Sequence, residues 1–140
     1  MAEKIKATTL TEFLAENTVD NITAEVFISE RFKKAGFAFK IRAMTGQEFN
    51  TYQKQATAVG RHKKVNFDSA LFNELVVINH TVEPNFKDAE ILAKMNCATP
   101  EQFLYSRLKA GEIAELATQI STLSGFDADQ ASLVDDVKNS

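Results

Sequence analysis

The chain has 140 residues, of which 44% are hydrophobic and 25% are charged, and it carries a formal net charge of −3 at pH 7. This length and composition predict a single globular domain that needs no metal ion or disulfide for stability, and the acidic balance argues against a nucleic-acid-binding module. No apolar run approaches the ~20 residues of a membrane-spanning helix and there is a single cysteine, so the sequence predicts a soluble intracellular protein without an intramolecular disulfide.

The first predicted element is a short helix that follows a loose leader at residues 1–8. Thr9 or Thr11 can cap its start through a side-chain oxygen, and Asn17 lies near its end. A helix of this length is only marginally stable in water, so we expect it to pack against another part of the protein.

Two stretches of alternating apolar and polar residues come next, over residues 24–29 and 37–43. This period of two is typical of strands with one buried face. Gly36 lies between them and can adopt a positive φ, so the pattern predicts a β-hairpin. A hairpin alone is not stable, so its apolar face must pack on helices or join the sheet of another chain.

Capping and stop signals divide the rest of the chain into helices. Thr45 and Glu48 form a capping box for a helix that Gly60 ends. Residues 61–67 are predicted to be a basic, irregular linker. Asp68 then caps an apolar helix that we expect to be central, although its run of β-branched residues leaves a strand as a minor alternative.

The C-terminal half begins with a corner at residues 82–88, where Pro84 prevents a helix from continuing. A short helix follows around Ile91, and Thr99 with a proline after it marks the start of another. The last helix ends at Gly125. It has the clearest helical stripe in the chain: Ile113, Leu116, Ala117, Ile120 and Leu123.

Together these elements predict an α+β fold, mainly helical, in which an N-terminal β-hairpin packs on a bundle of about five short helices. We expect one globular domain over residues 1–126 and an acidic tail over residues 127–140. Four aspartates and one lysine lie in this tail, where only Leu133, Val134 and Val137 could bury much surface. This composition predicts a mobile tail or a frayed helix.

The side chains that could carry chemistry form no convincing constellation. Cys97 is predicted to be a small buried hydrophobic residue, because no recognised motif places a base beside it. His62 and His80 match no zinc-ligand spacing and are predicted to be solvated, in a loop and at a helix end. Glu112 and Glu115 share a helix face, but nothing indicates the dry cleft that general acid–base catalysis needs. We therefore predict no catalytic residues, no metal site, no cofactor and no enzymatic activity.

One basic cluster, Arg61-His62-Lys63-Lys64, interrupts the acidic background. It is a weak signal for nucleic acid, because it is short and has a single aromatic residue, Phe67, nearby. We predict a solvated loop, with an electrostatic patch for an acidic partner as the alternative. Neither nucleic acid nor a membrane is expected among the partners.

Five segments, in their order and spacing, carry a resemblance to a known family. These segments are Phe39–Phe49, Val82–Ala89, Ala98–Phe103, Lys109–Ile113 and Ser124–Asp127. Each one alone is only a strand end, a corner or a helix cap. The ordered set spans residues 24–127 and resembles the phage XkdN-like tail assembly chaperone family.

The resemblance implies a non-enzymatic chaperone that acts in the morphogenesis of long-tailed phages or prophages. Its implied partner is the tape measure protein, with the tail tube protein as a second one, and binding is implied to precede polymerisation of the tube. The implied location is the host bacterial cytoplasm, and the protein is not expected in the mature virion. The alternative is a structural component of the tail or virion that is retained in the particle.

For partner binding we predict a groove beside the last helical stripe or the apolar face of the hairpin, with some of the 11 phenylalanines as anchors. The predicted partner-binding residues are Ile113, Leu116, Ile120, Leu123, Leu133, Val134 and Val137. The alternative is that these side chains fill the core of the domain itself. An exposed hairpin edge also leaves a homo-oligomer open.

Overall fold

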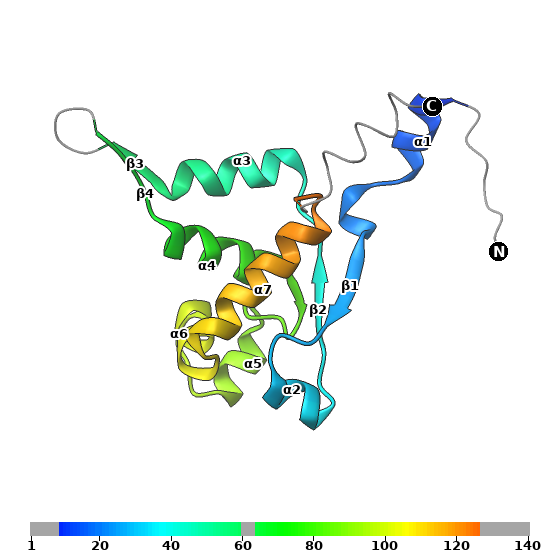
Figure 1. Ribbon diagram of the computed structural model, residues 1–140. Helices are drawn as coiled ribbons and strands as arrows, with labels where there is room; N and C mark the ends of the chain where they lie inside the picture. The colour runs from blue at the N-terminus through cyan, green and yellow to red at the C-terminus, as the bar shows by residue number, and fades with distance from the viewer. Residues whose placement is uncertain (1–8, 60–63, 127–140) are drawn as a thin grey trace.

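The computed structural model describes residues 9–59 and 64–126, in which helices alternate with short strands (Figure 1). The helices are α1 Leu10–Glu16, α2 Glu30–Ala35, α3 Gly46–Gln55, α4 Ser69–His80, α5 Ala89–Lys94, α6 Pro100–Arg107 and α7 Ala110–Leu123, with a short 3-10 turn at Val19–Asn21. The strands are β1 Thr23–Val26, β2 Phe39–Arg42, β3 Thr57–Val59, β4 Val65–Phe67 and β5 Thr81–Glu83. The described part is α+β and mainly helical, as the sequence predicts. The predicted leader and acidic tail lie outside the described residues.

The larger sheet is antiparallel and has the spatial order β1-β2-β5. The two strands predicted from alternation are neighbours, with Thr23 opposite Arg42 and Val26 opposite Phe39. The connection between them differs from the predicted hairpin turn, because it contains α2. Gly36 has φ 82° and ends α2 instead of forming a tight β-turn. The sheet also has a third strand, β5, which forms the start of the predicted corner.

A second, two-stranded sheet pairs β3 with β4, so that Thr57 lies opposite Phe67. Two predictions are corrected here. The helix that begins after Thr45 ends at Gln55 and does not continue to Gly60. Residues 65–67, predicted to be irregular, form β4. Alternation of Val65 and Phe67 with a polar residue suits a strand, and it is too short a pattern to be recognised without its pairing partner.

The predicted helix caps are present. A side-chain oxygen accepts a hydrogen bond from a backbone N–H at four predicted helix starts: Thr9, Thr45, Asp68 and Thr99. Thr45 and Glu48 make both bonds of the capping box, at 3.1 Å and 2.9 Å. Gly125 has φ 103° at the end of α7, in agreement with its predicted role as a stop.

The hydrophobic core lies between α4, α7 and the larger sheet. Helix α7 packs on α4 and also lies against β1 and β2 (Figure 1). The corner that includes Pro84 brings Phe86 into this core, where its ring centroid lies 4.8 Å from that of Phe103. The largest fully buried side chains are Phe86, Ile41, Leu104, Leu116, Ile120, His80, Val76 and Val77. The core therefore draws on both halves of the chain, and α7 is part of its centre.

Candidate partner-binding surface

The predicted binding stripe on α7 points into the core. Leu116 and Ile120 are fully buried, Ile113 is 9% exposed, and Leu123 is half-buried against the same core. In this conformation the first three side chains are not accessible to a partner. They match the alternative stated for them, which is packing within the domain.

The apolar face of the predicted hairpin and the predicted residues of the tail are not available as an exposed surface of the described structure either. On β2, Phe39 and Ile41 are buried, so the apolar face of this strand is also internal. The remaining predicted partner-binding residues, Leu133, Val134 and Val137, lie outside the described residues. Within the described residues, the apolar side chains available to a partner are therefore the exposed ones elsewhere on the fold.

The phenylalanines fall into buried, half-buried and exposed groups. Phe39, Phe86 and Phe103 lie in the core. Five others have exposed fractions between 45% and 67%: Phe13, Phe27, Phe37, Phe67 and Phe126. A single exposed apolar ring needs no explanation, but exposed rings that are contiguous mark candidate interaction sites.

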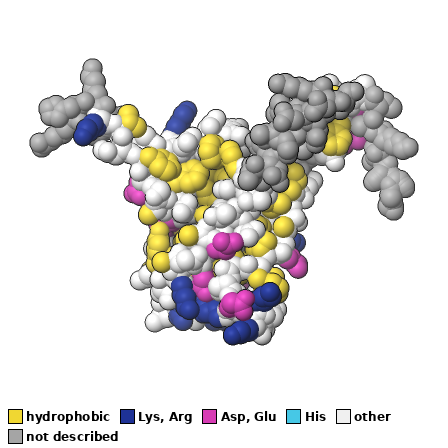
Figure 2. Space-filling view, viewed as in Figure 1, with side chains coloured by type: hydrophobic (Ala, Val, Ile, Leu, Met, Phe, Trp, Pro, Cys, Tyr) yellow, Lys and Arg dark blue, Asp and Glu magenta, His cyan; other side chains and the backbone are white. Residues whose placement is uncertain are grey.

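Four rings form one continuous row, which we call the aromatic strip: Phe67, Phe72, Phe49 and Phe126. Successive ring centroids lie 5.6, 5.6 and 4.9 Å apart, within the range of favourable aromatic contacts. The two inner rings are half-buried, whereas the end rings Phe67 and Phe126 are 50% and 53% exposed. Figure 2 shows hydrophobic side chains gathered in the region between α3 and α4, the two helices that contain Phe49 and Phe72.

The four rings come from four different parts of the fold. Phe49 lies in the first turns of α3, Phe72 in the first turn of α4, and Phe67 at the end of β4. Phe126 is placed by the cap of α7. Its N–H donates to the Ser121 carbonyl at 3.0 Å and that of Gly125 donates to Thr122 at 3.0 Å, which is the Schellman pattern. This cap turns Phe126 back towards Phe49.

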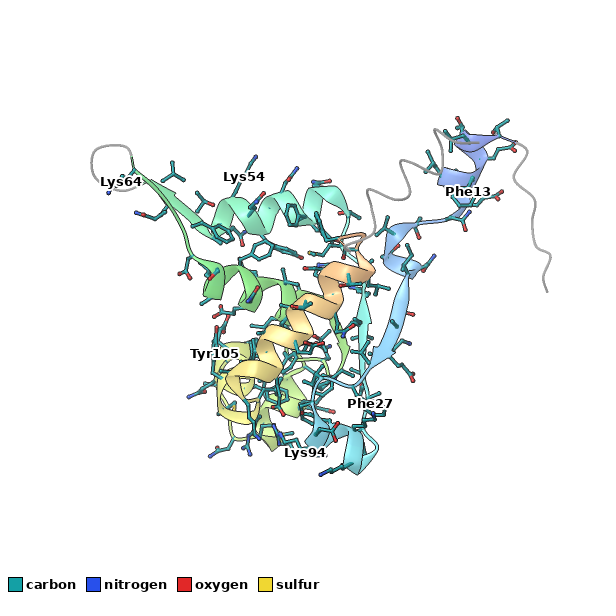
Figure 3. The ribbon with its side chains drawn as sticks, viewed as in Figure 1. Phe13, Phe27, Lys54, Lys64, Lys94 and Tyr105 are labelled. Carbon is teal, nitrogen blue, oxygen red and sulfur yellow. The ribbon has the colours of Figure 1, made fainter. Side chains whose placement is uncertain are left out.

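The Phe67 end of the strip is hollowed on two sides. One open pocket, of about 540 Å³, lies between the β3–β4 hairpin and the start of α4, and a second, of about 370 Å³, is lined by Lys54, Val65 and Phe67. Val65 is 67% exposed. Figure 3 shows Lys64 at the outer end of β4 and Lys54 on α3, and both side chains are exposed. The strip thus ends in an apolar patch that has exposed lysines nearby and the exposed Asp68 in the lining of one of its two pockets.

Glu112 has a structural role. This carboxylate is 2% exposed and accepts hydrogen bonds from Arg31 Nε at 2.6 Å, Ser29 Oγ at 2.7 Å and the Lys109 N–H at 2.7 Å. The bonds from Arg31 in particular lower the pKa of Glu112 to about 2. The Glu112 carboxylate thus joins α2 to the start of α7. Because it is ionised and accepts several hydrogen bonds, it is poorly suited to proton transfer.

His80 is buried, which corrects the prediction of a solvated histidine. It is the last residue of α4, and its Nε2 lies 2.8 Å from the Tyr52 hydroxyl and 3.9 Å from a Glu48 carboxylate oxygen. Burial, and secondly the charge of Arg42, lower the pKa of His80 to about 4. The ring is therefore neutral at pH 7. A helix end can be buried inside a domain, and the sequence around His80 does not indicate that this one is buried.

Cys97 is half-buried, with Sγ 3.4 Å from the Met95 carbonyl and 3.9 Å from the Ser106 hydroxyl. His62 lies outside the described residues. Across residues 9–59 and 64–126, no group of three or more His, Cys, Asp or Glu side chains is placed to hold a metal ion. No helix in the same ranges is long and apolar enough to cross a membrane.

Comparisons with known proteins point in one direction. The family described as phage XkdN-like tail assembly chaperone protein matches residues 10–138. Two Bacillus subtilis (strain 168) proteins are similar over 93% of this chain and 93% of their own: the uncharacterized protein YqbN, at 29% identity, and the phage-like element PBSX protein XkdN, at 25%. The crystal structure of YqbN aligns with a TM-score of 0.60 at 27% identity, covering 87% of this chain and all of that one. This chain therefore belongs to the phage XkdN-like tail assembly chaperone family.

Proposed function

We propose that this protein is a non-enzymatic tail assembly chaperone that binds an amphipathic helical segment of the tape measure protein on the aromatic strip. Family membership supports the role in tail assembly. The tape measure protein is the partner that the sequence resemblance implies, and the tail tube protein is a second candidate. The aromatic strip is the observation that carries the choice of surface.

Three properties of the strip support a helix as its ligand. It is apolar, it is continuous over four rings, and its end rings are about half exposed. Hydrophobic surfaces of partner proteins bind the apolar face of an amphipathic helix through anchors spaced at about one helical turn, and the row of rings offers an apolar surface for such anchors. Aromatic side chains are frequent among the residues that dominate binding energy.

The physical logic of the role follows from this surface. A long helical protein that must wait for its tube to polymerise exposes apolar stripes, and these stripes favour aggregation. A small domain that covers one segment of such a stripe would keep it in solution. Several copies on one long chain would cover more of it without any requirement for a tight single contact.

Co-expression with the tape measure protein of the same phage or prophage tests the proposal. We expect the chaperone to raise soluble recovery of the tape measure protein and to co-elute with it. Phe67→Ser and Phe126→Ser, in the same chain, should abolish co-elution, because they remove the exposed ends of the strip. Phe37→Ser is the matched control, since Phe37 is 67% exposed but lies before β2, outside the strip. If the wild type, the double variant and the Phe37→Ser control all co-eluted equally with the tape measure protein, the proposal would be contradicted.

The remaining expectations belong to the same proposal. We expect the protein to act in the host cytoplasm and to be absent from purified virions, and its detection there would favour a retained structural component. The segment 127–140 is proposed to be an acidic tail that adds to partner binding through Leu133, Val134 and Val137. Deleting this segment should weaken co-elution while the melting temperature changes little.

A further inference from the structure

A pocket of about 300 Å³, which we call the Tyr105 pocket, lies where α4, α6 and α7 meet. Ala70 of α4 and Ala110 and Ala114 of α7 contribute to its lining, so part of its wall is apolar and made of short side chains. The Tyr105 side chain, which is 51% exposed, forms another part of the wall. Figure 3 shows this side chain on α6, below α4 in the view. A pocket that combines an aromatic ring with short apolar side chains can accept one long side chain of a partner.

The Tyr105 pocket adjoins the surface at the Phe67 end of the aromatic strip. Ala70 lines both the Tyr105 pocket and the pocket of about 540 Å³ beside Phe67. Asp68, the residue that caps α4, lines the pocket beside Phe67 as well. Glu74 follows Ala70 by one helical turn, about 6 Å along α4. A partner helix anchored on Phe67 can therefore reach the Tyr105 pocket with a residue one or two turns away.

Negative charge surrounds the Tyr105 hydroxyl. This hydroxyl donates a hydrogen bond of 2.9 Å to Oε1 of Glu74, and Glu101 lies four residues before Tyr105, on the same face of α6. Burial, then the bond to Glu74 and the charges of Glu74, Asp68 and Glu101, raise the pKa of Tyr105 to about 12. None of these three carboxylates forms a salt bridge with another described residue. The rim of the pocket is therefore acidic.

The described residues that line the pocket include no lysine or arginine to balance this charge. Two cationic residues flank Leu108 in the chain, but both are directed elsewhere. Arg107 donates a hydrogen bond to the Met95 carbonyl at 2.8 Å, and Lys109 lines a different pocket together with Lys33. A cation supplied by a partner would therefore form a new interaction with the acidic rim and would not have to displace an existing one.

We propose that the Tyr105 pocket receives a lysine or arginine side chain of the helical segment that binds the aromatic strip. The inference rests on the proposed function and adds a charge requirement to it. The aliphatic stem packs on the alanines, the cationic head lies near Glu74 and Glu101, and the ring of Tyr105 makes a cation–π contact. This cation lies about 4 to 7 residues from the apolar residue that contacts Phe67, which is one to two turns of helix. An apolar helix without such a cation binds more weakly, so the pocket contributes selectivity.

Calorimetric titration of the purified full-length chain with synthetic helical segments of the tape measure protein tests this inference. Glu74→Gln with Glu101→Gln, in the same chain, should weaken binding of the tightest segment about fivefold at low salt and less at high salt, where charges are screened. Glutamine can still accept the bond from Tyr105, so the fold is kept. Glu25→Gln with Glu90→Gln is the matched control, because it removes two exposed carboxylates of β1 and α5 and changes the net charge equally. This control should bind like the wild type, and equal affinity of both double variants would overturn the inference.

Changes in the segment identify the cation itself. Each lysine and arginine of the segment is replaced by glutamine in turn. One of these replacements should weaken binding to the wild type about fivefold and should have no further effect on the variant that lacks the Glu74 and Glu101 charges. Such coupling cannot arise from a misfolded variant, because the same protein then serves as the reference for both segments. If no cation of the segment were coupled to these two carboxylates, the inference would be overturned.

The two sets of variants distinguish failure of this inference from failure of the proposed function. Phe67→Ser with Phe126→Ser removes the exposed ends of the strip, whereas Glu74→Gln with Glu101→Gln removes only the charge at the pocket. Weaker binding in both, with one coupled cation in the segment, is the expected result. Weaker binding in the strip variant alone would overturn the inference and leave the proposed function intact. Absence of binding between the wild type and every tape measure segment would overturn both.

Discussion

The ring of Phe126 packs against the ring of Phe49, with centroids 4.9 Å apart and an interplanar angle of 37°. Phe126 follows the last helix of the described chain and Phe49 lies in α3, so the contact links the C-terminal cap to the middle of the aromatic strip. The half-exposed Phe126 thereby extends the strip beyond the α3–α4 pair. Gly125, which ends α7, thus helps to position one ring of the surface that we propose to bind the partner.

Replacement of Gly125 by alanine tests this connection. Gly125 has φ 103°, a conformation that is unfavourable for residues with a Cβ, so the variant should lose about 1 kcal/mol of unfolding free energy. It should also weaken partner binding, because the cap that directs Phe126 is disturbed. Thermal denaturation and the co-elution assay measure the two effects.

Gly111→Ala is the matched control for that variant. Gly111 lies in the first turn of α7, and an added Cβ would meet no atom within 4 Å. Alanine at this position should be neutral or should stabilise the protein by about 0.5–1 kcal/mol. If Gly125→Ala and Gly111→Ala had the same effects on stability and on partner binding, the cap of α7 would not hold Phe126 in the way described.

Truncation of the α7 stripe should act on stability. Leu116 is fully buried between α7 and its neighbours, so Leu116→Ala should cost about 2–5 kcal/mol. Leu123→Ala, at the half-buried end of the helix, should cost less. Chemical denaturation measures both. If the folded fraction of Leu116→Ala bound the partner much more weakly than the wild type while Phe67→Ser did not, the stripe and not the aromatic strip would be the binding surface.

Loss of the Glu112 charge should destabilise the junction of α2 and α7. Glu112→Gln leaves Arg31 and the other donors without their buried carboxylate, and we expect a cost of about 1–3 kcal/mol. Glu115→Gln is the control. Glu115 accepts a bond from Gln119 at 2.7 Å within the same helix, and its replacement should cost less than about 0.5 kcal/mol. Equal melting temperatures for the two variants would show that the Arg31–Glu112 pair contributes nothing net.

Acidification should destabilise the protein through His80. The pKa of His80 is lowered from 6.5 to about 4 in the folded state, so between these values the unfolded chain binds more protons than the folded one. Stability contributed by the neutral ring is complete above about pH 6.5 and falls by up to about 1.4 kcal/mol per pH unit as the pH drops towards 4. Glu112 acts at lower pH, because its pKa is lowered from 4.5 to about 2.

His80→Gln isolates this effect. Glutamine keeps a polar side chain near the Tyr52 hydroxyl but does not titrate. The loss of unfolding free energy between pH 7 and pH 5, measured by denaturant titration, should be smaller in His80→Gln than in the wild type. An identical loss in both proteins would contradict the assignment of a neutral, buried His80.

Local signals in the sequence predicted the helix starts well. Thr45 and Glu48 form their capping box within one turn, so the interaction is determined by residues that are adjacent in the chain. The same holds for the stop at Gly125. Strand β5 was missed because its pairing with β2 depends on residues distant in sequence. The helix between β1 and β2 was missed because Gly36 suits a hairpin turn and a helix end equally well.

The surface was harder to predict for a physical reason. A helical apolar stripe shows that one side of α7 is covered, but it does not say whether the same chain or a partner covers it. The stripe at Leu116 and Ile120 is covered by the chain itself. The aromatic strip leaves no periodic pattern, because its four rings come from β4, α4, α3 and the cap of α7. The surplus of phenylalanine in the composition indicated an aromatic surface, but it did not show which phenylalanines form that surface.

The most direct test of the proposed function is the affinity of the purified chaperone for an apolar helical segment of the tape measure protein, measured by titration calorimetry. We predict that Phe67→Ser with Phe126→Ser weakens binding at least about tenfold, whereas Phe37→Ser, at a ring of greater exposure, leaves the affinity unchanged. Equal affinity of the wild type, the strip variant and the control would contradict the aromatic strip as the partner-binding surface.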